Sequence, residues 1–129
     1  MTTTQIDNVI PLAAARRRAT GRRALVEHLR RRQENAALFL RLAREAGIEI
    51  GDGACPPMIP CIVGDSVKAL QLSEALQRRG VSADPILFPA VPENEARLRF
   101  FVTSHHSEEK IRFMVEALAE ELDLLYARG

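Results

Sequence analysis

The most extended pattern in the chain is an apolar stripe in its N-terminal third. Between Arg22 and Ala46, apolar residues recur at spacings of three, four and seven, which is typical of one face of an amphipathic helix. Gly47 follows this stretch, at a position where glycine commonly ends a helix. The stripe that we expect to face the core consists of Leu25, Leu29, Ala36, Phe39, Leu40 and Ala43.

The residues that precede this helix show a weaker pattern. Residues 1–8 have no periodicity, whereas the three alanines at 13–15 are strong helix formers. Gly21 is expected to interrupt the helix that these alanines begin. We therefore expect residues 1–20 to form a loose segment with a helical start, and residues 21–129 to form a single domain.

Three short segments have the pattern of β-strands. The apolar run Met58–Val63 predicts one strand, and Pro60 places it at a sheet edge or a bulge because proline cannot donate a hydrogen bond. Val81–Phe88 predicts a second strand, which Pro85 cuts short. Arg97–Thr103 alternates most clearly between apolar and other residues. One of its faces carries Leu98, Phe100 and Val102, and the other carries Arg97, Arg99, Phe101 and Thr103.

Two further helices are indicated by residues that can cap them. Asp65 or Ser66 can begin one helix, which Gly80 closes, and Ser107 can begin the last helix. The predicted order is helix, strand, helix, strand, strand, helix. This order indicates an α+β fold, with a small, mostly antiparallel sheet, helices on one of its faces and a long N-terminal helix.

Composition narrows the possible classes of protein. With 129 residues, 47% hydrophobic and 27% charged, the chain fits one globular domain. No apolar run approaches the roughly 20 residues that cross a bilayer, and the polar N-terminus shows no secretory signal, so a cytoplasmic location is expected. Cys55 and Cys61 are too few for a disulfide framework and have no metal-ligand partners nearby, so no metal site is expected.

Charge is unevenly distributed, although the net charge is only +1. The first 45 residues contain ten arginines and four acidic residues, and the rest of the chain contains eight basic and thirteen acidic residues. Nucleic-acid binding through the arginine runs at 16–18 and 30–32 would predict a steep salt dependence. Acidic residues and the apolar stripe interrupt these runs, so a solvated helix face explains them better.

Arg99 is the main candidate for a functional side chain. It lies in the middle of the clearest predicted strand, on the face that alternation places away from the core, where a guanidinium can bind a carboxylate with two hydrogen bonds. A surface or interdomain salt bridge is the structural alternative, and it is the role expected for Arg97. His105 and His106 have no further ligands at the spacing of a metal site. No complete set of catalytic residues is apparent, so none is named.

Four segments, in the same order and spacing, resemble one family of enzymes. They are MIPCIVGD at 58–65, ALQRRG at 75–80, FPAVP at 88–92, and ARLRF followed by TSHHS at 96–107. On these motifs, the chain from Pro57 to Leu122 resembles the C-terminal domain of the α-oxoamine synthases. These are pyridoxal-phosphate-dependent (PLP-dependent) acyltransferases of fold type I, in aminotransferase class I/II.

The resemblance implies an activity and a role for one residue. Such enzymes condense an amino acid with an acyl-CoA or another acyl thioester, with decarboxylation, and the second arginine of their A-R-L-R motif binds the amino-acid carboxylate. That position here is Arg99. The family binds PLP in a large upstream domain, through a Schiff-base lysine, an aspartate and a stacking histidine. Lys68, Lys110 and His28 match none of these, so this chain alone is expected to bind no cofactor and to be inactive.

Two functions are left open by the sequence. In the first, the chain is the C-terminal domain of an α-oxoamine synthase, as a fragment, a split subunit or a degenerate relative, and works with a chain that carries the PLP-binding large domain. In the second, it is a non-catalytic, stand-alone binding or interaction module that retains the small-domain fold, for which a homodimer is expected. Amino-acid and acyl-thioester substrates are expected only as part of a full enzyme.

Overall fold

A computed structural model describes residues 12–51, 54–55 and 57–128. The predicted loose start therefore lies, up to residue 11, outside the described residues. Within them, three α-helices and a three-stranded antiparallel sheet confirm the predicted α+β class. The elements are α2 (Leu12–Glu45), β1 (Met58–Ile62), α3 (Ser66–Arg78), β2 (Asp84–Ile86), the short 3₁₀ helix η1 (Glu93–Glu95), β3 (Arg97–Phe101) and α4 (Glu108–Arg128).

The strands are arranged in the order β1-β3-β2, and both pairings are antiparallel. Pro60 in β1 and Pro85 in β2 both lie in edge strands, where proline is tolerated because the position of its missing N–H can face away from the neighbouring strand. The edge position of Pro60 was expected from the sequence. β2 is shorter than the predicted segment and retains only three residues around Pro85.

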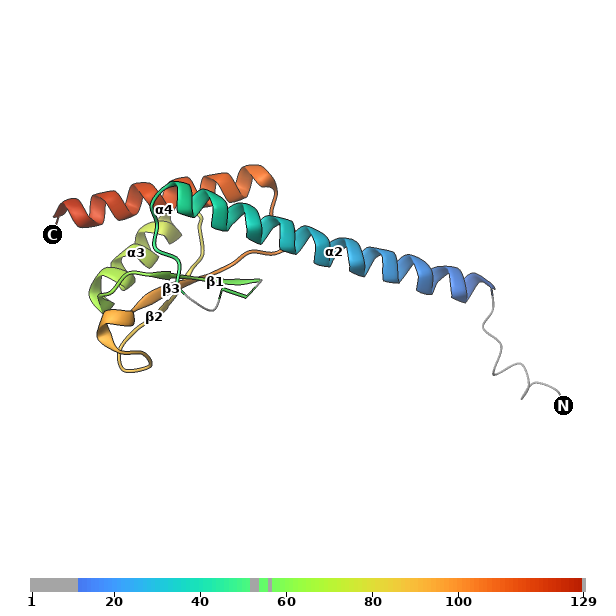
Figure 1. Ribbon diagram of the computed structural model, residues 1–129, viewed down its shortest axis with the longest axis horizontal. Coiled ribbons are helices and arrows are strands. Elements are labelled where there is room, and N and C mark those ends of the chain that lie inside the picture. Colours follow the sequence, from blue (N-terminus) through green and yellow to red (C-terminus); the bar gives the residue numbers. More distant parts are fainter. Residues whose placement is uncertain (1–11, 52–53, 56, 129) are drawn as a thin grey trace.

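The helices cover one face of the sheet (Figure 1). α4 packs against both α2 and α3, and α3 contacts β2 and β3. The inward side chains Leu98, Phe100 and Val102 are fully buried beneath these helices, as the alternation of β3 predicts. The ring of Phe100 lies 5.2 Å from that of Phe39, measured between centroids, and this contact joins α2 to the sheet.

α2 is one continuous helix of 34 residues that includes Gly21, so the break predicted there is wrong. A single glycine costs a helix only about 1 kcal/mol relative to alanine, and good helix formers flank it on both sides. The helix ends as expected before Gly47, which has a φ of +76°. The N–H of Ile48 then donates to the carbonyl of Ala43 at 2.9 Å, which closes the last turn.

The apolar stripe of α2 is buried only in its second half. Ala36, Phe39 and Ala43 are buried, but Leu25 and Leu29 remain 59% and 41% exposed. The reason is geometric, because the N-terminal half of α2 extends beyond the sheet and the other helices (Figure 1). The expectation of a core position is therefore wrong for Leu25 and Leu29.

The two shorter helices begin at the predicted caps. The Asp65 carboxylate accepts a hydrogen bond from the N–H of Lys68 at 2.9 Å, and Ser107 Oγ accepts one from the N–H of Lys110 at 3.0 Å. The buried stripe of α4 includes Ile111, Met114, Val115, Leu118 and Leu125. No helix in the described part of the chain is long and apolar enough to cross a bilayer.

Candidate substrate-carboxylate site

The sheet face that the helices leave uncovered carries the candidate residue Arg99. Residues directly opposite each other in an antiparallel pair project to the same face. The register places Pro60 of β1 and Asp84 of β2 on either side of Arg99. Phe101, two residues further along β3, shares this face and is 43% exposed. Arg99 therefore lies at the centre of an open surface built from all three strands.

The two arginines of β3 differ in what they contact. Arg97 Nε donates to the carbonyl of Glu95 at 2.9 Å, and its guanidinium lies 3.4 Å from the Glu95 carboxylate. This ion pair is the structural role that the sequence suggested for Arg97. Arg99 makes no ion pair with any described residue, and its buried Nε has no hydrogen-bond partner among them. Its guanidinium carbon lies 5.9 Å from the centroid of the Phe101 ring.

An arginine in this arrangement is suited to bind an anion. Burial of Nε without a partner costs free energy, because the group gives up water without gaining a protein acceptor. A carboxylate that accepts hydrogen bonds from Nε and from one terminal nitrogen removes this cost and matches the planar guanidinium. The central strand is held by neighbours on both sides, so the backbone that carries Arg99 is fixed in position.

The loop after β3 is tied to α2 by side-chain hydrogen bonds. Asn35 Nδ2 donates to the carbonyls of Thr103 and His106, at 2.8 and 2.9 Å. His106 Nδ1 accepts a hydrogen bond from the N–H of Thr103 at 3.0 Å. Burial, followed by the nearby charge of Lys110, lowers the pKa of His106. The neutral His106 ring thus stabilises the turn in the loop that follows β3.

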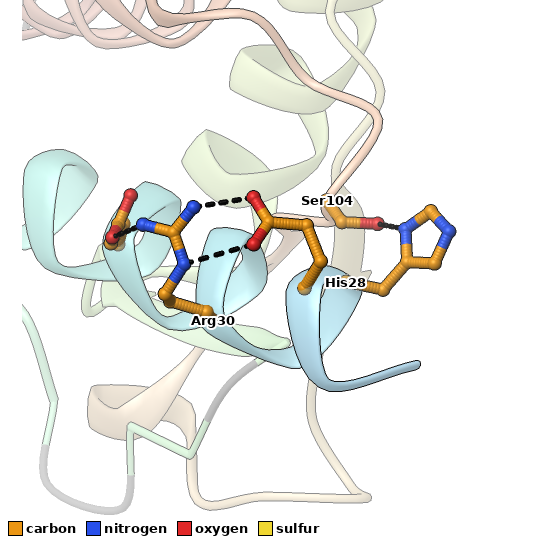
Figure 2. Close-up of polar contacts among 5 residues, drawn as sticks. His28, Arg30 and Ser104 are labelled. Carbon is orange, nitrogen blue, oxygen red and sulfur yellow. Dashed lines mark hydrogen bonds and ion pairs between the residues drawn. The ribbon is translucent and has the colours of Figure 1, made fainter. Parts of the chain in front are cut away.

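A second contact between α2 and this loop was not foreseen from the sequence. His28 Nδ1 lies 3.1 Å from Ser104 Oγ (Figure 2). The His28 ring centroid also lies 5.8 Å from that of His105. The partners are 76 residues apart in sequence, and nothing in their local pattern relates them. No group of three His, Cys, Asp or Glu side chains in the described residues could hold a metal ion.

The arginine-rich face of α2 is partly neutralised by its own acidic residues. Figure 2 shows the Arg30 guanidinium between two carboxylates, which belong to Glu27 and Glu34. These pairs at spacings of three and four are typical of a solvent-exposed helix face. The carboxylates of Glu27 and Glu34, on the same helix, both contact the Arg30 guanidinium. Arg30 is therefore not the isolated cation that a phosphate-binding patch would need.

The two cysteines lie in different environments and are both free thiols. Cys55 is exposed, whereas Cys61 is buried in β1. Burial, with a smaller effect from the Glu49 charge, raises the pKa of Cys61 to about 12. The Cys61 thiol therefore stays protonated at neutral pH and behaves as a small apolar core residue.

The chain's two lysines do not form a PLP site with the other described residues. Lys68 extends from α3 within the helical layer, and its Nζ lies 5.2 Å from the centroid of the Tyr126 ring. Lys110 Nζ donates to the carbonyl of Gly80 at 3.2 Å and lies 5.2 Å from the Phe113 centroid. Among the described residues, neither lysine lies near Arg99 together with both an acidic partner and a set of phosphate-binding groups. The described residues therefore do not fit the cofactor by themselves.

Solved structures define the class of protein to which this fold corresponds. Serine palmitoyltransferase from S. paucimobilis, solved with a bound PLP–myriocin aldimine, matches with a TM-score of 0.71 and 18% identity, over 80% of this chain and 26% of that chain. The 8-amino-7-oxononanoate synthase of Francisella tularensis matches with a TM-score of 0.63 and 21% identity, over 74% of this chain and 28% of that chain. The fold is that of the C-terminal region of fold-type I PLP enzymes.

Sequence comparison gives a more specific relationship. The chain is 40% identical over 94 residues to the 8-amino-7-oxononanoate synthase of Symbiobacterium thermophilum, which covers 73% of this chain and 24% of that protein. Over most of its length the chain thus has α-oxoamine synthases as homologues, and the resemblance inferred from its motifs is confirmed. The chain spans about a quarter of the length of these relatives. No protein-family model matches it.

Proposed function

We propose that this chain is the substrate-binding C-terminal domain of an α-oxoamine synthase, and that Arg99 binds the α-carboxylate of the amino acid. The reaction would be the decarboxylative condensation of that amino acid with an acyl thioester. The observation that carries the proposal is the position of Arg99, whose guanidinium lacks an ion pair among the described residues and lies at the centre of the open sheet face. Arg97, on the same face, is already paired with Glu95.

Under the same proposal, the cofactor is bound by residues other than those that the structure describes. Lys68 and Lys110 are the only lysines of the chain; Lys68 lies against the Tyr126 ring, and Lys110 donates to the carbonyl of Gly80. A separate segment or partner chain, acting in the cytoplasm, would supply the Schiff-base lysine. Incubation of the 129-residue protein with PLP and borohydride should then modify neither Lys68 nor Lys110. Specific labelling of one of them, in a stoichiometric amount, would place the cofactor on this chain instead.

Arginine side-chain NMR tests the role of Arg99 directly. In the full 129-residue chain, the Nε–H signal that disappears in Arg99→Gln identifies the residue. This signal should shift when L-alanine or glycine is added, with an affinity on the order of millimolar. L-alaninamide, which lacks the carboxylate, should leave it unchanged. Arg97→Gln is the matched control and should retain the response, because Arg97 is held by Glu95. An Arg99 signal that ignores amino acids, or that follows the amide equally, would contradict the proposal.

A second function is favoured by the completeness of the core. The buried faces of β3, α3 and α4 close on one another within these residues. A stand-alone module that binds a partner or a small carboxylate could therefore keep this fold without taking part in catalysis. The two functions differ in a complementation assay with an 8-amino-7-oxononanoate synthase that lacks its matching quarter. Restored condensation that depends on Arg99 supports the enzyme domain, whereas carboxylate binding without any restored activity supports the module.

A further inference from the structure

The N-terminal half of α2 carries an apolar surface that no described part of the chain covers. Leu25, Val26 and Leu29 lie on this half, which extends beyond the sheet and the other helices, and they are 59%, 63% and 41% exposed (Figure 1). Arg22 and Arg32 lie at the two ends of the same side of the helix, and neither forms an ion pair with a described residue. We call these five residues the α2 stripe. It is apolar at its centre and positively charged at both ends.

The exposed side of α4 carries the opposite charge. Glu109, Glu116 and Asp123 follow one another at intervals of seven residues, so they lie along one side of the helix. All three are exposed, and none forms an ion pair with a described residue. Phe113, which is 37% exposed, lies between the first two, and Leu124, which is 51% exposed, follows the third. These five residues form the α4 stripe, which combines negative charge with apolar side chains.

The basic residues near the α4 stripe already have partners. Arg112 pairs with Glu108 on the same helix at 2.9 Å, and Arg79 pairs with Glu120 at 3.0 Å. Lys110 donates its ammonium group to a backbone carbonyl at 3.2 Å. The three carboxylates of the α4 stripe therefore keep their negative charge without a counter-charge among the described residues.

The two stripes lie apart within one chain, but a second copy of the chain can bring them together. α4 packs against α2 through its buried side, beside the half of α2 that lies over the sheet (Figure 1). A copy related by a two-fold axis can place its α4 beside the projecting half of the first α2. The same rotation then places the first α4 beside the projecting half of the second α2, so the contact is made twice.

Charge favours this pairing over the two alternatives that use the same surfaces. Two α2 stripes in contact would bring arginines against arginines, and two α4 stripes would bring carboxylates against carboxylates, which is unfavourable in both cases. The pairing of α2 with α4 places opposite charges together. It also removes the exposed leucines of α2 and Phe113 of α4 from water, which is favourable.

The spacing of the charges along the two helices is compatible with this contact. At 1.5 Å per residue, Arg22 and Arg32 are about 15 Å apart along α2, and Glu109 and Asp123 are about 21 Å apart along α4. Phe113 has Glu109 on one side of it and Glu116 on the other. With the leucines of the α2 stripe against the Phe113 ring, each arginine lies within the reach of its long side chain from a carboxylate.

We propose that the α2 stripe is a dimerisation surface and that its partner is the α4 stripe of a second copy of this chain. Arg99 lies on the sheet face that the helices leave uncovered, so both Arg99 side chains stay accessible in the dimer (Figure 1). The inference thus goes beyond the proposed function and does not depend on it.

Sedimentation velocity of the full 129-residue chain tests the proposal over a range of protein concentrations. We expect a dimer with a dissociation constant on the order of 10 μM, as is typical of a small and partly polar contact. Because the contact pairs exposed charges, the affinity should fall about tenfold when NaCl is raised from about 50 mM to about 500 mM. A chain that stays monomeric at several hundred μM and low salt (roughly thirty times that dissociation constant) would overturn the proposal.

Reversal of the charges identifies the surfaces that meet. One chain carries Glu109→Lys, Glu116→Lys and Asp123→Lys, and the other carries Arg22→Glu and Arg32→Glu. Each chain alone should be monomeric, because its two stripes have the same charge. An equimolar mixture should form a heterodimer, since each stripe then meets its opposite. A dimer that survives reversal of the α4 stripe, or two folded chains that stay monomeric when mixed, would show that these stripes are not in contact.

A second pair of variants tests the apolar part and does not depend on the folding of the reversed chains. Leu25→Ser with Leu29→Ser should weaken the dimer at least tenfold, and circular dichroism should show an intact fold because both side chains lie outside the core. Val67→Ser is the matched control, because Val67 is 65% exposed on α3 and belongs to neither stripe. An equal effect of the control and the leucine variant, or no effect of the leucine variant, would refute the proposal. The carboxylate response of Arg99 is measured separately, so failure of the dimer leaves the proposed function unaffected.

Discussion

Replacement of Asn35 measures how firmly α2 holds the loop that follows Arg99. Asn35 is half-buried in α2, and its Nδ2 donates to the carbonyls of Thr103 and His106 at 2.8 and 2.9 Å. Asn35→Ala removes both of these hydrogen bonds, although the Thr103 carbonyl still accepts one from the N–H of His106 at 3.3 Å. With a net contribution of about 1 kcal/mol for each lost bond, we expect a loss of about 2 kcal/mol in the free energy of unfolding.

Urea unfolding followed by circular dichroism gives this value directly. The midpoint should fall while the dependence on urea stays the same, because the folded and unfolded states expose the same surface as before. Gln33→Ala is the matched control, since Gln33 is exposed two residues earlier in the same helix, and it should change stability by less than about 0.5 kcal/mol. A loss for Asn35→Ala no larger than that of the control would show that these two hydrogen bonds do not hold the loop in solution.

Two further predictions concern titratable groups. Burial and the charge of Lys110 lower the pKa of His106 below its ordinary value of 6.5, so the unfolded state binds a proton more readily than the folded state. The contribution of His106 to stability should therefore be fully present above about pH 6.5 and decline as the pH falls below it. His106→Gln should flatten this decline in urea midpoints measured at several pH values. An equal slope in the variant would rule out His106 as its source. The two thiols should differ in reactivity, because Cys55 is exposed and burial raises the pKa of Cys61 to about 12. A thiol reagent at mildly alkaline pH should modify one cysteine per folded chain and two in denaturant, and rapid modification of both in the folded protein would contradict the buried position of Cys61.

Local signals in the sequence predict correctly those parts of the fold that depend on neighbouring residues. The caps at Asp65 and Ser107, the helix end before Gly47 and the alternation of β3 each depend on neighbouring residues, and each is present in the structure. Gly21 predicts a break when taken alone, but the cost of one glycine is small and the helix formers on both sides keep α2 continuous.

Other features depend on how distant segments meet. The apolar spacing of Leu25 and Leu29 continues that of the buried half of α2, and only the extent of the sheet decides that these residues stay exposed. The contact between His28 and Ser104 joins segments 76 residues apart. The juxtaposition of Asp84 and Arg99 depends on the strand register, which the short and proline-containing β2 does not reveal in its sequence.

The difference between Arg97 and Arg99 connects the stability of this fold to its proposed role. Arg97 forms an ion pair with the Glu95 carboxylate and a hydrogen bond with the Glu95 carbonyl, so it stabilises the fold without a ligand. Arg99 lies in the central strand of the sheet. Its buried Nε has no hydrogen-bond partner among the described residues, and this destabilises the protein when no ligand is bound. An anion that binds there recovers this cost, and the fixed backbone means that little further ordering is needed on binding. A guanidinium with no ion pair among the described residues therefore fits the proposed role of Arg99 in binding a ligand better than a role in folding.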